Sequence, residues 1–329
     1  MLLSFFTSFY DALPKTVAYG IIWGIMAIGV YITFRLLDFP DLTVDGSFAT
    51  GGAVMAMYLT DKEWNLWACL LMAFIAGGLA GLMTGIFHTK FGIPAILAGI
   101  LSQLALYSIN LRIMDGKANQ AVNARNYDLL IYPVDPERAI WVSTLFALAL
   151  IVILYWFFGT ELGSSIRATG TNAAMARANG INTSRNTIIG LVLSNAIVGL
   201  SGALYVQWQG SADVQMGRGA IVIGLAAVII GEVLLGKIFK NFALRMVSCV
   251  VGGVVYYVTI TLVLQFDFME PSDLKLLTAL VVALFLGVPY WKGKLTIKRL
   301  GMVNAKKAAA QAQESSDASD VPVSTGGDA

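Results

Sequence analysis

The chain has 329 residues, of which 57% are hydrophobic and 13% are charged, and its formal net charge is +2. Soluble globular domains carry about 25% charged residues, so this composition excludes an ordinary soluble domain. The small net charge gives no reason to expect a nucleic-acid partner. The charges lie between long apolar runs, and residues 1–9 lack the basic segment of a cleavable signal peptide. This distribution is typical of a polytopic membrane protein.

A helix needs about 20 mostly apolar residues to cross a bilayer. The sequence offers nine such segments: 16–35, 46–59, 66–88, 94–111, 140–158, 186–207, 219–235, 242–266 and 274–291. The second and seventh are short and contain or open with glycines, which is compatible with broken or re-entrant segments that line a cavity. The predicted fold class is all-α, a polytopic transmembrane helical bundle with about eight to ten spans.

Three regions are predicted along the chain. Residues 1–15 form an N-terminal extracytoplasmic segment, 16–291 the transmembrane domain, and 292–329 a cytoplasmic basic stretch with a tail whose polar composition predicts disorder. Lys and Arg residues divide fourteen to eight between the two sets of alternating loops. Because the richer set normally lies in the cytoplasm, we expect the N-terminus outside and the C-terminus inside.

Small residues recur at helical spacing within the predicted spans. Gly20 and Gly24 form one such pair, and 77–85 contains three glycines four residues apart. This spacing lets helix backbones approach closely in lipid, either within one chain or between two copies. Cys69 and Cys249 each lie inside an apolar run, so both are predicted to be buried core residues rather than a disulfide or metal pair.

The polar loop 160–186 separates two predicted spans and is longer than a connection requires. Thr171 or Asn172 can cap a short helix over 173–179, and Gly180 can end that helix with a positive φ angle. Ser184 is then the expected cap of the next span. A short helix held in this way forms a rigid projection, which suits docking to another protein.

The same loop resembles the coupling-helix region of ABC importer permeases of the branched-chain amino acid and ribose type. The resemblance rests on Leu162-Gly163, Arg167-Ala168 and Gly180-Ile181-Asn182, although Asn179 replaces the apolar residue usual before that glycine. It implies a type II ABC importer-like fold and a coupling helix that sits in a groove of an ATPase subunit. The implied ATPase contacts are Gly163, Arg167, Ala168, Ala174, Arg177, Gly180, Ile181 and Asn182.

A second resemblance lies at 37–48, LDFPDLTVDGSF. It is similar to the Asp-Leu-Ser-Val-Gly-Ser signature of the ribose-type branch, with Asp45 inserted, and to a branch linked to aromatic amino acids. Pro40 and Gly46 prevent a continuous helix. The segment is either a broken helix beside a translocation path or a capped start of the second span, and the two are compatible. Candidate path residues are Asp41, Thr43, Asp45, Ser47, Gln103, Asn110 and Asn195.

The resemblance implies the permease subunit of an ATP-driven importer for a small solute such as an amino acid. The expected partners are two ATPase subunits, an extracytoplasmic solute-binding protein that docks on the loop 112–138, a second permease copy and the bilayer of a bacterial inner membrane. No catalytic residue, metal ligand set or cofactor is expected. The alternative is an ion-coupled secondary transporter, which would require acidic residues at mid-membrane and internal repeats.

Three further signals are weaker. Residues 231–237 match a nucleotide-binding P-loop except that Ile238 stands where Ser or Thr must hold magnesium, so ATP hydrolysis is expected in a separate subunit. Glu232 is an acid in an apolar run, which indicates either a functional residue or an ion pair with Lys237. His88, the single histidine, is expected to be an interfacial polar residue.

Overall fold

The computed structural model describes residues 2–123, 127–236, 238, 241–265, 276, 278–284 and 287. The chain divides into two units, Met1–Val282 and Ala283–Ala329, and the fold below is that of the first unit. The predicted tail at 292–329 lies outside the described residues, as does half of the ninth candidate span, 274–291.

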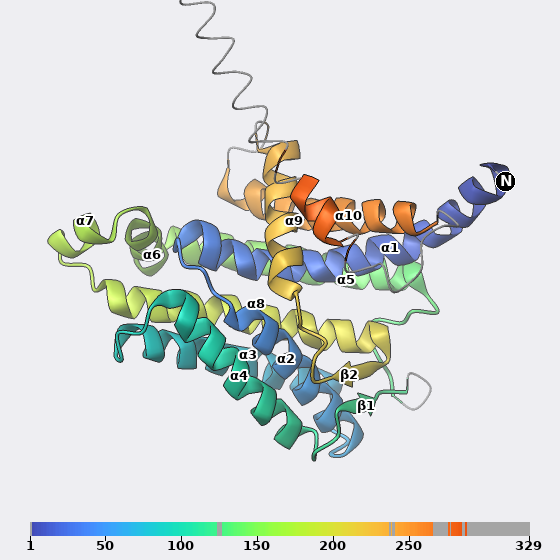
Figure 1. Ribbon diagram of the computed structural model, residues 1–329, viewed down its shortest axis with the longest axis horizontal. Coiled ribbons are helices and arrows are strands. Elements are labelled where there is room, and N and C mark those ends of the chain that lie inside the picture. Colours follow the sequence, from blue (N-terminus) through green and yellow to red (C-terminus); the bar gives the residue numbers. More distant parts are fainter. Residues whose placement is uncertain are drawn as a thin grey trace, which may run out of the picture. The chain divides into compact units, whose positions relative to one another are not determined.

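The described part of the first unit consists almost entirely of helices (Figure 1). In chain order they are α1 (Leu2–Tyr31), the π-helical turn η1 (Ile32–Leu36), α2 (Thr43–Thr60), α3 (Leu66–Thr89), α4 (Ala95–Ile113), α5 (Pro136–Gly159), α6 (Glu161–Thr171), α7 (Ala173–Ala178), α8 (Thr183–Gln209), α9 (Ala220–Leu235) and α10 (Phe242–Leu264). Two short strands, β1 (Asn119–Ala121) and β2 (Ser211–Asp213), pair antiparallel. The all-α prediction is therefore confirmed, with one small ribbon added.

Six of the described helical segments are long and apolar enough to cross a membrane. They are Phe9–Leu36, Leu66–Thr89, Ala95–Ile113, Pro136–Gly159, Thr183–Gln209 and Phe242–Leu264. The two short candidates also form helices, α2 with 18 residues and α9 with 16. Residues 2–15 are not a separate element, because α1 runs without interruption from Leu2 into the first span.

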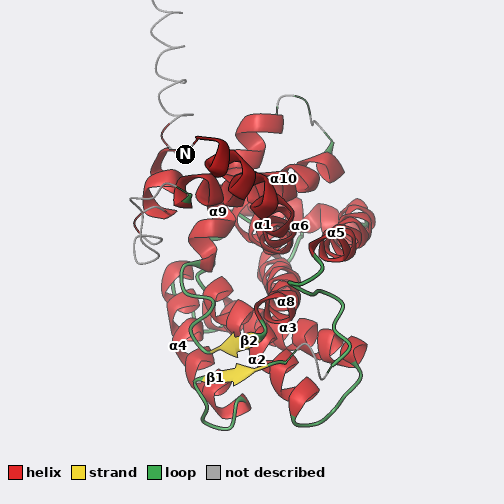
Figure 2. Cartoon of the chain, turned by 90° about the vertical axis from the view of Figure 1, so that its right-hand side faces the viewer, coloured by secondary structure: helices red, strands yellow, loops and turns green. Residues whose placement is uncertain are grey.

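Helix α8 holds the bundle together, since it packs against α1, α2 and α3, whereas α10 packs against α1 and α9. The helices α6 and α7 lie at one end of the long helices and the β1–β2 ribbon at the other (Figure 1). Figure 2 looks onto the ribbon end, where α1, α5 and α8 are seen nearly end-on. We call the two ends the α7 end and the ribbon end.

Glycines explain how closely these helices pack. A side chain at Gly77 of α3 would collide with the backbone carbonyl of Asn195 on α8, and one at Gly20 of α1 would collide with the backbone of Val254 on α10. The glycine spacing therefore serves packing within the chain at these positions. Both cysteines are free and buried, as predicted.

Candidate functional site

Helix α2 begins inside the bundle, directly after the break predicted at Pro40. The chain leaves η1, runs through a short irregular segment and enters α2 at Thr43. One carboxylate oxygen of Asp41 accepts the backbone N–H of Thr43 at 2.9 Å. An acid at this place satisfies a free donor at the helix start. The helix is therefore broken before α2 and the start of α2 is capped, whereas a translocation path beside this segment stays a prediction.

Around this start lies a network of buried polar side chains, which we call the α2 network. Asn195 of α8 donates to the second carboxylate oxygen of Asp41 at 2.7 Å and accepts from the hydroxyl of Ser47 at 2.6 Å. The hydroxyl of Thr43 lies 2.6 Å from that of Thr84 on α3, which in turn donates to Ser102 on α4 at 2.7 Å. The network therefore joins α2 to three neighbouring helices.

The α2 network lies deep within the bundle. Asn195 is near the middle of the 27-residue helix α8, and its side chain is fully buried. An ionisable group at such a depth is costly unless protein groups satisfy it. Asp41 meets this requirement, because it accepts one hydrogen bond from the backbone and one from Asn195.

Asp45, one turn further along α2, binds the start of another helix instead of the α2 network. Its two carboxylate oxygens accept the backbone N–H groups of Gly219 at 3.0 Å and Ile221 at 2.9 Å. These groups belong to the start of α9, where a carboxylate also complements the helix dipole. Asp45, the residue inserted relative to the ribose-type signature, thus fixes the N-terminus of the short helix α9 beside the start of α2.

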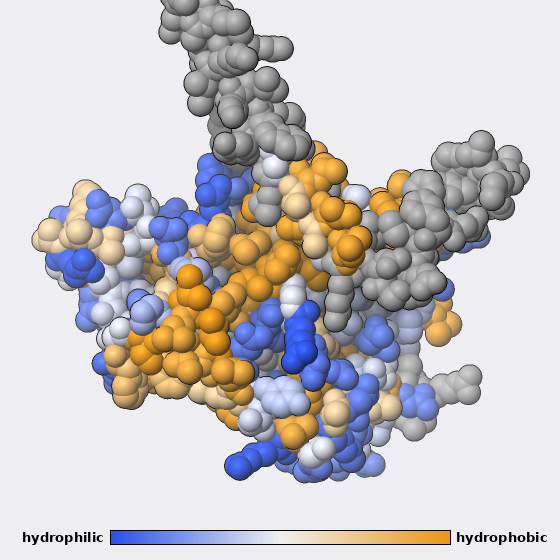
Figure 3. Space-filling model, in the orientation of Figure 1, coloured by the Kyte–Doolittle hydropathy of each residue, from blue (hydrophilic) through white to orange (hydrophobic). Residues whose placement is uncertain are grey.

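Three of the candidate path residues line one cavity. Asp45, Gln103 and Asn110 border a space of about 470 Å³ between α2, α4 and the segment 214–218. On the face drawn in Figure 3, hydrophilic residues gather near the start of α9, and hydrophobic residues extend above them and to their left. The seven candidates therefore separate into two adjacent groups, four in the α2 network and three along this cavity.

The polar loop 160–186 folds into two helices rather than one. Helix α7 ends at Ala178, one residue earlier than predicted. Its cap is Asn172, whose side chain accepts the N–H of Met175 at 3.0 Å. Gly180 has the predicted positive φ angle, +79°. The prediction that Ser184 caps the next helix is wrong. The cap of α8 is Asn182, which accepts the N–H of Arg185 at 3.0 Å, and α8 begins at Thr183.

Helix α6 was not predicted. Its start carries a recognisable signal, since Thr160 accepts the N–H of Gly163 at 3.3 Å and Glu161 occupies the first turn. Gly163, Ile166 and Thr169 form its buried side. Of these three, only Ile166 is a large apolar residue, so the sequence shows no apolar stripe that would predict the helix.

The predicted ATPase contacts differ in exposure. Those exposed at the α7 end are Ala174, Arg177, Gly180 and Asn182; those half-buried are Arg167, Ala168 and Ile181. Gly163 is buried against Phe158, where any side chain would collide with the backbone. Glycine is therefore needed at this position so that α6 can pack closely against the end of α5. Met175, which the sequence did not single out, is 64% exposed on α7.

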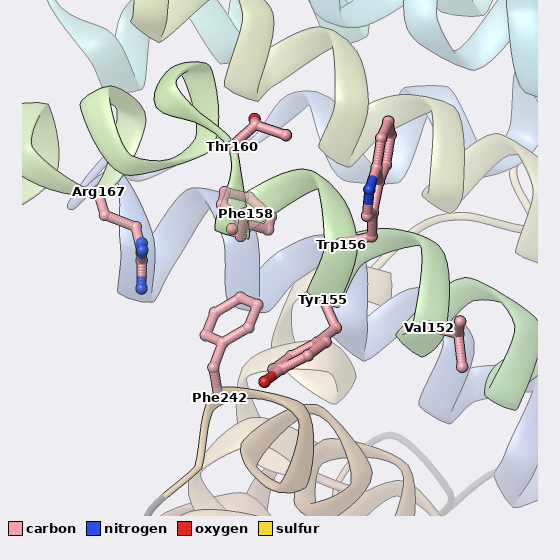
Figure 4. A pocket seen from close by; sticks show the side chains of 8 residues that line it. Val152, Tyr155, Trp156, Phe158, Thr160, Arg167 and Phe242 are labelled. Atoms are coloured by element: carbon pink, nitrogen blue, oxygen red, sulfur yellow. The ribbon is translucent and has the colours of Figure 1, made fainter.

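Arg167 points away from the tip of α7. Its guanidinium lies over the ring of Phe242 on α10, 5.8 Å from the centroid, and borders a hollow of about 560 Å³. Figure 4 shows Tyr155 and Trp156 of α5 lining the same hollow. Arg167 and Arg177 therefore belong to different surfaces of the loop region.

Glu232 forms an ion pair, but with a partner distant in sequence. Arg35 at the end of η1 donates to its two carboxylate oxygens at 2.8 and 2.6 Å. The predicted partner Lys237 lies outside the described residues. The residues 231–235 are helical, which a phosphate-binding loop would not be. The ion pair joins η1 to α9.

The ribbon end is built by the long loop 112–138 together with the segment after α8. Gln120 of β1 pairs with Ala212 of β2, and the side chain of Gln207 accepts the backbone N–H of Leu130 at 3.0 Å. Aromatic residues, among them Trp64, border a hollow of about 520 Å³ at this end. The sequence did not predict the ribbon because a strand of three residues is too short to show the alternation of apolar and polar residues that indicates a strand.

Comparison with known proteins gives a consistent set of matches. Residues 13–289 match the family described as branched-chain amino acid transport system, permease component. The chain is 40% identical to the tyrosine transport system permease protein of Clostridioides difficile over 287 residues, which is 87% of this chain and 92% of the relative. It is 27% identical to the ribose import permease protein RbsC of Escherichia coli K12 over 236 residues, 70% of this chain and 71% of the relative.

A third relative is the autoinducer 2 import system permease protein LsrC of Yersinia pestis (strain Pestoides F). It is 28% identical over 239 residues, 69% of this chain and 66% of the relative. The family match spans every described helix from most of α1 to α10, and the six apolar helices fit a multi-pass membrane protein. The chain therefore belongs to the branched-chain amino acid transport system permease family and is the permease component of an ABC-type importer.

Proposed function

We propose that this permease imports an amino acid, that two copies form the path, and that each copy docks an ATPase subunit through the loop 160–186. The observation that carries the docking proposal is the construction of α7. A helix of six residues is capped at Asn172 and ended by a left-handed Gly180, with Ala174, Met175 and Arg177 exposed on it. Such a helix keeps its shape without burying its surface, as a docking element requires.

The coupling proposal follows from what α6 and α7 touch. Asn186 in the first turn of α8 donates to Thr169 of α6 at 3.0 Å, and Thr183 accepts from Arg177 at 3.4 Å. A displacement of α7 by a partner would therefore reach α8, which carries Asn195 of the α2 network. Closure of two ATPase subunits can tilt the permeases by this route without any chemistry in the permease itself.

The amino-acid proposal is supported by the relative named as a tyrosine permease and by the polar lining of the cavity. The ribose and autoinducer 2 relatives are less similar to this chain. An amino acid carries two opposite charges and a side chain, and the cavity borders charged, amide and apolar groups together. The charged side chains of the cavity therefore suit an amino acid better than a neutral sugar.

The orientation proposal places the α7 end in the cytoplasm. Six described basic residues lie on segments at that end: Arg35, Lys90, Arg167, Arg177, Arg185 and Arg245. The opposite loop set also holds six described basic residues, so the bias comes from the whole sequence, in which the first set has fourteen Lys and Arg residues and the opposite set eight. Cytoplasmic loops of membrane proteins carry such an excess. The N-terminus and the ribbon end are then extracytoplasmic, and the ribbon end with the loop 112–138 becomes the docking surface of a solute-binding protein.

Reconstitution tests these proposals together. The permease is purified with the ATPase and the solute-binding protein encoded beside it, placed in proteoliposomes, and supplied with each of the twenty radiolabelled L-amino acids. We expect ATP-dependent uptake of one or a few amino acids and equal numbers of permease and ATPase subunits. Uptake driven by an ion gradient without ATP would favour the secondary-transporter alternative and refute the proposal.

A further inference from the structure

We propose that Arg218 and Asn110 form a carboxylate-binding subsite in the cavity beside α2, where the transported amino acid is held by its two charges during passage. This inference deepens the proposed function and rests on it. None of the comparisons and none of the signature residues points to Arg218 or to its place in the cavity.

Arg218 is exposed and lines the same cavity as Asp45 and Asn110. It belongs to the segment that returns from the ribbon into the bundle, and its neighbour Gly217 is packed against the backbone of Asp45. Its guanidinium borders the cavity and makes no hydrogen bond or ion pair with the residues that the structure describes. A guanidinium that borders a cavity without a partner of its own is available to bind a carboxylate through two parallel hydrogen bonds.

Asn110 of the same cavity supplies an independent observation. It lies on α4, is 1% exposed and borders the same cavity. Neither its amide oxygen nor its amide nitrogen has a hydrogen-bond partner within the described part of the chain. Buried polar side chains are almost always satisfied, so an unsatisfied one facing a cavity indicates a ligand or water that completes it.

The charges of the cavity select the class of ligand. Asp45 borders the cavity, and each of its oxygens accepts only one hydrogen bond, so a carboxylate with four acceptor positions can still receive an ammonium group. A simple anion would be repelled by Asp45, and a simple cation would be repelled by Arg218. A zwitterion satisfies both, with its carboxylate at Arg218 and its ammonium group at Asp45.

The remaining lining fits the rest of an amino acid. Ile100, Leu104 and Tyr107 of α4 present apolar surface to the cavity, and Gln103 offers one more polar group. The volume of about 470 Å³ lies within the range of small-molecule sites, roughly 300–1,000 Å³. The arrangement accommodates a single amino acid with an apolar or aromatic side chain.

The test compares arginine variants in the reconstituted complex. Arg218→Met is expected to reduce uptake of the transported amino acid about 10- to 100-fold, the loss that corresponds to a charge-assisted hydrogen bond. Arg218→Lys retains the charge and is expected to recover part of the uptake. The matched control is Arg112→Met, since Arg112 is an exposed arginine outside the cavity lining. Co-purification with the ATPase verifies that each variant is assembled.

A second measurement separates a binding role from a structural one. The amine obtained by decarboxylating the transported amino acid lacks the group that Arg218 holds, and we expect it not to compete with uptake by the wild-type complex. Asn110→Leu is expected to lower uptake as well, without loss of assembled complex.

The outcomes distinguish this inference from the proposed function. If the wild-type complex takes up an amino acid and Arg218→Met does so equally well, the subsite is refuted and the importer proposal stands. Equal losses for Arg218→Met and Arg112→Met also refute the subsite. If the wild-type complex takes up none of the twenty amino acids, the amino-acid proposal fails and the subsite fails with it.

Discussion

The α2 network and the loop 160–186 are both polar, yet they are held in opposite ways. Asn195 contacts Asp41 and Ser47, which are far away in sequence and lie on or just before another helix. In the loop, Asn172 and Asn182 each cap the helix that begins at the next residue, by accepting the N–H of the residue three positions on. The network is thus part of the tertiary fold, whereas the loop obtains its shape from local interactions and leaves its surface free for a partner.

This difference has a consequence for substitutions. A change within the buried contacts of α2, α3 and α8 is expected to lower the free energy of unfolding of the whole bundle. A change on α7 is expected to leave that free energy almost unaltered and to alter partner binding. Each prediction below tests one side of this contrast.

The largest effect is expected for Gly77→Ala. The added methyl group would collide with the backbone carbonyl of Asn195, so α3 and α8 would have to separate. We expect a loss of about 3 kcal/mol in the free energy of unfolding, the upper end for overpacking. Thermal unfolding of the purified permease in detergent measures it.

The adjacent residue provides the control. A methyl group at Gly78 would meet its nearest neighbour at 3.5 Å, an ordinary contact. Alanine in a helix is favoured over glycine by about 0.5–1 kcal/mol, so Gly78→Ala should leave stability unchanged or slightly higher. Similar losses for both variants would show that α3 does not pack on α8 in this register.

A smaller loss is expected for Asn195→Leu. The substitution removes the donor to Asp41 and the acceptor of Ser47. Hydrogen bonds between membrane helices contribute roughly 0.6 kcal/mol each and up to about 1.7, so we expect a loss of about 1–2 kcal/mol. The check is a double-mutant cycle, in which Ser47→Ala should cost less in the Asn195→Leu background than alone. Additive losses would contradict the hydrogen bond between the two residues.

A local effect is expected for Gly180→Ala. Gly180 has a φ of +79° and no atom close to where a side chain would lie, so the cost is conformational, about 1 kcal/mol. The control is Gly92→Ala, because Gly92 has a φ of +69°, equally open surroundings and a position between α3 and α4. Only Gly180→Ala should weaken co-purification with the ATPase. Equal weakening by both variants would refute the special role of this turn.

The same contrast explains what the sequence could predict. The short helix, a cap at Thr171 or Asn172 and the left-handed Gly180 were predicted because each depends on neighbours within a few residues, and the structure selects Asn172 as the cap. Asp41, Ser47 and Asn195 could be named as polar residues of apolar segments, but their mutual hydrogen bonds depend on how α2 packs against α8.

Other features had no local signal at all. The pairing of Arg35 with Glu232 joins residues about two hundred positions apart, and sequence proximity favoured Lys237 instead. The capping of α9 by Asp45 requires two helix starts to meet in space. Arg218 looked like an ordinary loop residue until the fold placed it beside Asp45 and Asn110.

The most direct test of the docking account is Ala174→Trp. Ala174 is exposed on α7, so a tryptophan there should leave the melting temperature of the permease unchanged while it blocks the groove into which α7 is proposed to fit. The control is Ala118→Trp, since Ala118 is also an exposed alanine but lies at the ribbon end. We predict that Ala174→Trp abolishes ATPase co-purification and ATP-dependent uptake, whereas Ala118→Trp retains ATPase binding. Normal ATPase binding and uptake by Ala174→Trp would contradict the assignment of this loop as the docking site.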